Sequence, residues 1–528
     1  MFRRVAAATM RLDTTTGRSV KERRMTDPNR PAAGATPAYS ELEQRHARIY
    51  RFEHLGSIVG WDQAANMPPK GNEARAAAMA ELDTLLHGLR TDAWLRDLLQ
   101  RAEDEPLSDW QRANLREMRR DWRASNALPA RLVEQRTLAT ARCEHAWRRQ
   151  RPANDWAGFV ENFRPVLRVA REEAQCLSQE TGLAPYDALM DRYEPGMTSA
   201  EVERVFGDLK TWLPDLVRKV QERQRDEPVL LPQGPFARPA QKAISLAMMQ
   251  RLDFDFDAGR LDESTHPFSG GVPEDVRLTT RYLDHDLHQS LMGTVHETGH
   301  ARYEQNLPRS WLGQPIARAR SYGIHESQSL SFEMQLGAHP GFVRMLVPML
   351  VDHFGAQPAF EVDNLCRLMT RVKPGFIRVD ADELTYPAHV ILRFEIERAL
   401  IEGGLEVEDI PALWDAKMAD YLGVDTRGNF ADGPMQDVHW PSGAFGYFPC
   451  YTLGAMYAAQ WFAAMRRATP DLDAQIEAGN LKPVFDWLSQ NIWQQASRWE
   501  TPELALRASG ERLNPAHYRA HLEQRYLG

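Results

Sequence analysis

Apolar residues recur every three or four positions along most of the chain after residue 40. This spacing is typical of helices that bury one face. The clearest stretch begins at Thr198, where Glu201 completes the spacing of a capping box. Pro214, inside the same stretch, is expected to kink the helix. Its apolar stripe consists of Val202, Val205, Phe206, Leu209, Leu213, Leu216, Val217 and Val220. Similar spacing predicts helices around residues 42–55, 74–88, 131–150, 384–401 and 452–466.

One region departs from helical spacing. Within residues 252–283, Val276, Leu278 and Thr280 alternate with arginine and threonine, which is a strand pattern. We therefore expect a small sheet of two or three strands there. Because we find no fixed repeat and no evident linker, the pattern predicts a mainly α fold with one large domain over residues 39–528.

The first 38 residues differ from the rest. They are rich in arginine and threonine, then in proline and alanine, so we expect residues 1–38 to form a disordered extension. The apolar run VAAATM is too short for a secretory signal. An organelle transit peptide or a translation start at Met25 would each explain this segment.

The composition narrows the class of protein. Of 528 residues, 43% are hydrophobic and 26% charged, as in ordinary globular proteins. The net charge of −9 argues against a nucleic-acid partner, and we find no apolar run of the roughly 18–20 residues that span a bilayer. The four cysteines form no CxxC pair, which favours reduced thiols in the cytoplasm.

The strongest chemical signal is the sequence VHETGH at residues 295–300. His296 and His300 are four apart, so on a helix both imidazoles lie on one face and can bind one metal ion. Glu297 would lie beside a metal-bound water and act as general base. This is the HExxH arrangement of zinc hydrolases.

The residues around the motif favour a helix. Leu287, Leu291 and Val295 form an apolar row that leads into it, and Pro308 is expected to end it. Gly299 lowers helix propensity by about 1 kcal/mol relative to alanine. We interpret this glycine as a place where another segment approaches the metal closely.

A catalytic zinc usually has three protein ligands and one open position. Residues 321–337 have the spacing of a second helix, which we expect Gly337 to cap. Glu326, in the first turn of that helix and 26 residues after His300, is the preferred third ligand. His325 competes for that role; otherwise it supports the ligands from behind or contacts substrate.

Further segments accompany these motifs in a fixed order. They are GWDQAANMP at 60–68, HPF at 266–268, DVRLT at 275–279, HETGH at 296–300, HESQS at 325–329, IRVDADELTY at 377–386, and GPMQDVHW with GYFPCYTLGAMY at 433–457. In these segments the chain, from about Tyr39 to its end, resembles the carboxypeptidase Taq family, also called the M32 metallopeptidases.

The resemblance implies a mostly helical fold with a deep groove, a small sheet beside the metal-binding helix, and a homodimer. It implies hydrolysis of single amino acids from the C-terminus of peptides, with broad preference and poor cleavage of C-terminal proline. Zinc is the implied metal, and cobalt substitutes for it. The ligands and base of the family fall on His296, His300, Glu326 and Glu297. Cys450 departs from the serine or threonine expected at its position.

A carboxypeptidase must recognise a terminal carboxylate, and the planar fork of arginine suits this task. Arg378, in the segment IRVDAD, is the first choice and Arg277, in DVRLT, the second. Either arginine could instead form an ion pair that stabilises the fold and does not bind substrate. For Arg378 the expected partner in such a pair is Asp380 or Asp382.

Other residues are candidates for substrate contact. His439, Tyr447 and Tyr451 could each donate to the oxyanion that develops during hydrolysis, or be satisfied wall or core residues. His266, in HPF, either lines the site or orients its turn. An exposed edge strand beside the metal would pair with the substrate backbone, which explains broad specificity and a poor fit for proline.

Two other functions remain open on the residues alone. A helical zinc oligopeptidase or dipeptidase would use the same HExxH-plus-glutamate site and would differ in the size of its products. A catalytically silent helical binding scaffold would be expected to lack Glu297 or one of the ligands.

Overall fold

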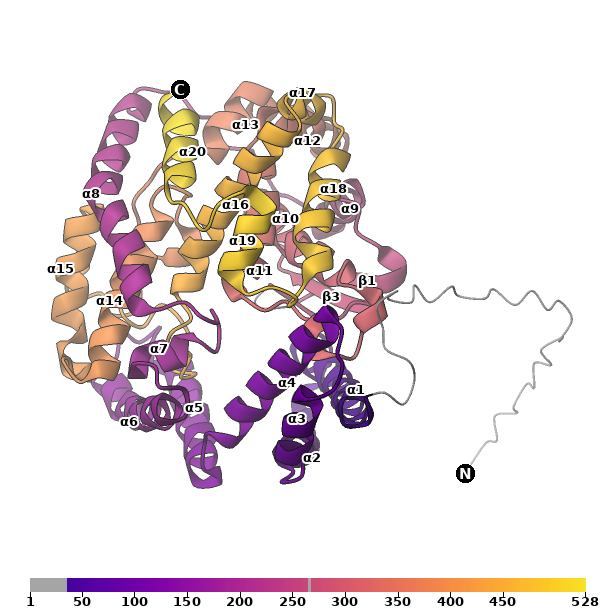
Figure 1. Ribbon diagram of the computed structural model, residues 1–528. Helices are drawn as coiled ribbons and strands as arrows, with labels where there is room; N and C mark the ends of the chain where they lie inside the picture. The colour runs from indigo at the N-terminus through magenta and orange to yellow at the C-terminus, as the bar shows by residue number, and fades with distance from the viewer. Residues whose placement is uncertain (1–35, 265–266) are drawn as a thin grey trace, which may run out of the picture.

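The computed structural model describes residues 36–264 and 267–528. His266 and residues 1–35 of the expected extension lie outside the described residues. Within the described part the fold is mainly α with one small sheet, as predicted (Figure 1). No described helix is both long enough and apolar enough to cross a membrane. The deep groove implied by the resemblance stays a prediction.

The helices fall into three runs along the chain. The first consists of α1 (Pro37–Ala65), α2 (Asn72–Thr91), α3 (Leu95–Glu103) and α4 (Asp109–Asn126). The second consists of α5 (Ala130–Gln150), α6 (Trp156–Thr181), α7 (Pro185–Met190), α8 (Ser199–Gln224) and α9 (Arg238–Arg251). The third, after the sheet, consists of α10 (Leu287–Gln305), α11 (Tyr322–Leu330), α12 (Pro340–Phe354), α13 (Val362–Met369), α14 (Tyr386–Glu402), α15 (Ile410–Leu422), α16 (Pro449–Ala468), α17 (Leu472–Glu477), α18 (Lys482–Asn491), α19 (Thr501–Ser509) and α20 (Ala516–Leu527).

Helix α8 confirms the clearest sequence pattern. All eight residues of the predicted stripe are buried. The Thr198 hydroxyl accepts from the Glu201 backbone N–H, and the Glu201 carboxylate accepts from the Thr198 backbone N–H, so the capping box is present. Pro214 lies inside the helix, as expected.

The folded part begins slightly earlier than predicted. Pro37 opens α1, and the backbone N–H groups of Ala38 and Tyr39 donate to the carboxylate of Glu105 at 2.8 and 3.0 Å. Residues 36–38, assigned to the extension, therefore belong to the fold. Helices α1–α4 have small apolar clusters of their own and form a separate group at the bottom of Figure 1.

The predicted sheet has three strands, β1 (Gly259–Glu263), β2 (Phe268–Val272) and β3 (Asp275–Thr280). Their order is β1-β3-β2, with β1 parallel and β2 antiparallel to the central strand β3. Val276, Leu278 and Thr280 are buried, as the alternation in β3 predicted. Both β2 and β3 contact α10, so the sheet lies beside the helix that carries the HExxH motif.

Helix α10 starts and ends as the sequence indicates. Asp286 caps its first turn by accepting from the Gln289 backbone N–H, and the helix stops at Gln305, before Pro308. Leu287, Leu291 and Val295 are buried.

The second helix differs from prediction at its far end. Helix α11 continues as a π-helical segment, Ser331–Gly337, which is capped by Ala338. Gly337 is thus the last helical residue and not the cap. Its lack of a side chain serves packing, because a β-carbon there would lie 2.5 Å from the Met292 methyl group.

Helix α20 secures this π-helical segment. Arg525 donates to the carbonyl of Met334 at 2.6 Å and to the carboxylate of Glu383 at 2.8 Å. Because a π-helix leaves irregular hydrogen bonding in its backbone, a side-chain donor of this kind stabilises it.

Candidate metal centre

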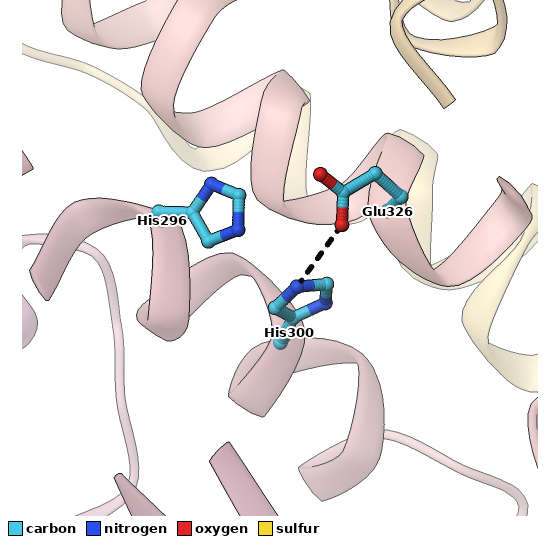
Figure 2. Close-up of side chains that lie close together, drawn as sticks. All are labelled: His296, His300 and Glu326. Atoms are coloured by element: carbon cyan, nitrogen blue, oxygen red, sulfur yellow. Dashed lines mark ion pairs between the residues drawn. The ribbon is translucent and has the colours of Figure 1, made fainter. Parts of the chain in front are cut away.

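Helices α10 and α11 bring the three predicted ligands together. His296 and His300 project from successive turns of α10, and Glu326 reaches them from α11 (Figure 2). One ligand atom from each lies within 4.8 Å of the other two. His300 Nε2 lies 3.4 Å from Glu326 Oε2.

These residues fit a single divalent ion. Ligand atoms on a tetrahedral zinc with bonds of about 2.1 Å lie about 3.4 Å apart, which matches the separation of His300 and Glu326. Two imidazoles and a carboxylate are donors that zinc accepts. Burial raises the pKa of Glu326, but the neighbouring His300 and His296 lower it overall, which favours the charged carboxylate.

Two glycines allow this convergence. A β-carbon at Gly299 would lie 2.5 Å from the carbonyl oxygen of Gln328 on α11. A β-carbon at Gly454, on α16, would lie 2.7 Å from the β-carbon of Glu326. Helix α11 is therefore held tightly between α10 and α16. The close approach that we inferred from Gly299 is made by the helix that carries Glu326, the predicted third ligand.

Each histidine also has a partner behind it. His296 Nδ1 lies 2.7 Å from the Glu333 carboxylate, which comes from the π-helical segment. Burial lowers the pKa of His296, but Glu333 raises it to about 10 overall.

His300 is held by a different group. His325 Nδ1 lies 2.6 Å from His300 Nδ1, and His325 Nε2 lies 2.8 Å from the Glu304 carboxylate. Burial and the neighbouring His325 lower the pKa of His300 to about 4, which keeps it neutral and able to ligate. In this structure His325 contacts Nδ1 of His300, the ring nitrogen that does not face Glu326.

Glu297 is buried at 8% exposure beside the three ligands. The side chain of Ser269, on β2, lies near this carboxylate. Burial raises the pKa of Glu297, although His296 and Ser269 oppose the shift. A carboxylate whose proton affinity is raised is suited to general base catalysis near neutral pH.

The fork of Arg378 is occupied. Its Nε and Nη2 donate to the two oxygens of Asp437 at 3.1 and 2.9 Å, and the side chain is buried. Asp437 also pairs with Arg393 at 2.9 Å. The prediction of an ion pair between Arg378 and Asp380 or Asp382 was therefore wrong. Asp382 instead accepts from backbone N–H groups nearby in sequence.

Arg277 is also paired. It donates to both oxygens of Asp275 at 2.9 and 2.8 Å and stacks on Trp61, with its guanidinium 4.4 Å from the ring centroid. Its side chain is 18% exposed and that of Asp275 is 27% exposed, so this pair is more open to solvent than the Arg378 pair.

His439, Tyr447 and Tyr451 form one cluster at the start of α16. His439 Nε2 lies 3.1 Å from the Tyr451 hydroxyl, and the rings of Tyr447 and Tyr451 are 5.2 Å apart. Burial lowers the pKa of His439 to about 4 and raises that of Tyr451 to about 12. Glu326 is among the charges that raise the pKa of both tyrosines, so these neutral donors lie near the third ligand.

Cys450 does not add an accessible thiol to this region. It is buried at 1% exposure near Glu194, and burial raises the pKa of the thiol. Glu194 in turn accepts from the Ser321 hydroxyl and the Gly323 backbone N–H, and so fixes the start of α11.

Sequence reasoning did not identify four supporting residues: Ser269, Glu304, Glu333 and Asp437. Two of them had a signal in their spacing. Glu304 is four residues after His300, on the same helix face, and Glu333 is seven residues after Glu326.

Comparisons with known proteins identify the family of the chain. The family model for the carboxypeptidase Taq (M32) metallopeptidases matches residues 41–526. A curated relative, thermostable carboxypeptidase 1 of Thermus thermophilus, is 36% identical over 502 residues, covering 93% of this chain and 98% of the relative. Carboxypeptidase 1 of Bacillus subtilis is 33% identical and covers 91% of this chain and 96% of its own length.

Solved structures give the same result. Metallocarboxypeptidase 1 of Trypanosoma cruzi superposes with a TM-score of 0.91 at 46% identity, covering 93% of this chain and 99% of that one. A carboxypeptidase of Pyrococcus furiosus, described as Apo-Mg, has a TM-score of 0.89 at 30% identity with the same coverage. The chain therefore belongs to the carboxypeptidase Taq (M32) family of metallopeptidases, which are peptide hydrolases.

Proposed function

We propose that the protein is a zinc carboxypeptidase that removes single amino acids from the C-terminus of peptides. The observation that carries this proposal is the convergence of His296, His300 and Glu326 around one position, with Glu297 buried beside them. The donor set suits Zn²⁺, and Co²⁺ would substitute for it because it accepts the same ligands.

A bound zinc ion would supply Lewis acidity for the scissile carbonyl and for a water molecule. Glu297 takes the proton of that water and delivers it to the leaving amine, a role that typically contributes about 10²–10⁴-fold to the rate. Ser269, which lies near this carboxylate, favours its charged form.

The terminal carboxylate of the substrate requires a positive charge. Arg378 and Arg393 share a single aspartate, Asp437, so this buried cluster carries one surplus positive charge. We propose that Arg378 attracts the carboxylate through this charge, with its fork kept on Asp437. Arg277, which is more exposed, is the second candidate.

Tyr447, Tyr451 and His439 are the proposed donors to the developing oxyanion. All three are held uncharged by burial, and the two tyrosines lie within the electrostatic influence of Glu326. A neutral hydroxyl in a low-dielectric site stabilises a developing negative charge without itself ionising.

Strand β2 suits recognition of the substrate backbone. It is an edge strand, and it carries Ser269, which lies near Glu297. A β-carbon at Gly270 would meet no atom within 4 Å, so there is open space over one face of the strand. Backbone pairing along this edge would accept most side chains and disfavour proline, which lacks the N–H.

We also propose, from the family, that the protein acts on peptides as a homodimer in the cytoplasm. Light scattering at micromolar concentration tests the assembly. A mass near 60 kDa, that of one chain, would contradict the dimer.

The rival activity is an oligopeptidase or dipeptidase that uses the same metal site. A mass-spectrometric time course on N-acetylated peptides distinguishes the two, with Glu297→Gln as the control. Successive loss of single C-terminal residues, absent in the control, supports the carboxypeptidase. Dipeptides or internal fragments would support the rival. Intact peptides in a metal-loaded sample would support the silent scaffold.

A further inference from the structure

The two ring nitrogens of His300 face different groups. Nε2 lies 3.4 Å from Glu326 Oε2, on the side where the ligands converge. Nδ1 lies 2.6 Å from His325 Nδ1, and the second nitrogen of His325 lies 2.8 Å from Glu304 Oε1. The three side chains thus form a continuous hydrogen-bonded chain from Glu304 to His300.

When His325 is neutral, only one arrangement of protons is possible along these three hydrogen-bonded side chains. An ionised carboxylate can only accept, so His325 Nε2 must carry a proton and donate to Glu304. In a neutral imidazole the other nitrogen is then an acceptor, so His325 Nδ1 accepts from His300 Nδ1–H. The lone pair of His300 is left on Nε2, which faces the ligand position.

His296 shows the same arrangement in a shorter form. Its Nδ1 donates directly to Glu333 at 2.7 Å, without an intervening ring. Both histidines are therefore anchored through Nδ1 to a carboxylate. The difference is that an imidazole, His325, occupies the space between His300 and its carboxylate.

We propose that His325 and Glu304 are positioning residues that fix the tautomer and ring orientation of His300 for metal binding. On this assignment His325 is not a substrate contact. The proposal rests on the proposed ligand set of His296, His300 and Glu326. Partners of this kind typically change metal affinity by about 10–100-fold when removed.

The test measures metal affinity directly. Dissociation constants for Zn²⁺ and Co²⁺ are obtained by chelator competition for the wild type, His325→Ala, His325→Gln, Glu304→Ala and Glu304→Gln. His325→Ala leaves the His300 N–H without a partner, so we expect about 10–100-fold weaker binding. The amide oxygen of His325→Gln can still accept from His300, so this variant should recover part of the affinity. Glu304→Gln should likewise bind more tightly than Glu304→Ala.

Two further variants calibrate the result. His353→Ala removes an exposed histidine of α12 that bonds only to the Met349 carbonyl among the described residues, so its metal affinity should equal that of the wild type. His300→Ala removes a proposed ligand and should lose far more affinity than His325→Ala. If His300→Ala bound metal normally, the proposed ligand set would be wrong, which separates failure of that proposal from failure of this one.

Steady-state kinetics at saturating metal supply a second measurement. We expect KM to change little in His325→Ala while the metal dissociation constant rises. Metal affinity within about threefold of wild type, together with a raised KM, would overturn the proposal and make His325 a substrate contact. If His325→Ala fails to fold by circular dichroism, the comparison of Glu304→Ala with Glu304→Gln decides, and equal affinities there would overturn the proposal.

Discussion

Gly299 on α10 lies directly against Gln328 on α11, where a β-carbon would sit 2.5 Å from the carbonyl oxygen. A Gly299→Ala substitution should therefore push α11 outward and carry Glu326 away from the histidines. We expect weaker metal binding, by at least about tenfold, although alanine favours the helix itself by about 1 kcal/mol. Chelator competition measures this change.

Gly293 provides the matched control on the same helix. A β-carbon there would meet no atom within 4 Å. Gly293→Ala should keep full metal affinity and raise stability slightly, because only the propensity gain applies. Equal effects of the two substitutions would show that the close approach at Gly299 does not matter for the site.

Removal of the metal should lower stability. A ligand that binds only the folded state at 100 times its dissociation constant adds about 2.7 kcal/mol to the free energy of unfolding. Thermal unfolding of the metal-loaded and chelator-treated protein should therefore differ by several degrees. In Glu326→Ala, which lacks the proposed third ligand, added Zn²⁺ at the same concentration should give a much smaller shift.

Asp437 should be essential for stability. It is the carboxylate that pairs with both Arg378 and Arg393, so Asp437→Asn leaves two buried guanidinium groups without a counter-charge. Breaking a buried pair of this kind costs about 3–5 kcal/mol, which urea unfolding would measure. Asp425→Asn, at an exposed pair with Arg427, should leave the unfolding midpoint unchanged.

Glu383 should make stability depend on acid pH. Burial raises the pKa of this carboxyl, but Arg525 and His521 lower it overall, to about 2 from its ordinary 4.5. A depressed folded-state pKa stabilises the protein above pH 4.5, and this contribution, about 3 kcal/mol, is lost as the pH falls toward 2. Glu383→Gln should thus be less stable than wild type at pH 7, with a gap that narrows in acid. A gap that stayed constant from pH 7 to pH 3 would refute the assignment.

Residue spacing was sufficient to predict geometry that lies within a single helix or strand. The stripe of α8 and the alternation of β3 follow directly from residue spacing, because side-chain direction repeats with a fixed period in each element. The pairing of His296 with His300 rests on the same period. Their convergence with Glu326 needed only a loop long enough to return the chain.

Partners distant in sequence could not be chosen in this way. Asp380 and Asp382 were considered for Arg378 because they are adjacent, yet the partner is Asp437, 59 residues away. Burial makes the difference: tertiary packing places one carboxylate between two arginines, and no spacing rule encodes that choice.

The carboxylates that support the histidines could not be assigned from the sequence for another reason. Glu304 and Glu333 lie on the expected helix faces, but which histidine each one meets depends on how α10 and α11 cross. The segment after Leu330 that carries Glu333 is also a π-helix. Apolar spacing alone did not distinguish this segment from ordinary α-helix.

The contact between Arg525 and Met334 has a consequence for synthesis of the protein. The two residues are 191 positions apart. At usual elongation speeds, roughly 10–40 s separate the emergence of one from that of the other on the ribosome. Through this interval a nascent chain already carries both imidazoles and Glu333, but not the guanidinium of Arg525 that donates to the π-helical segment. If translation stalls before α20 is complete, the chain carries the proposed metal-binding residues but lacks the hydrogen bond from Arg525 to Met334.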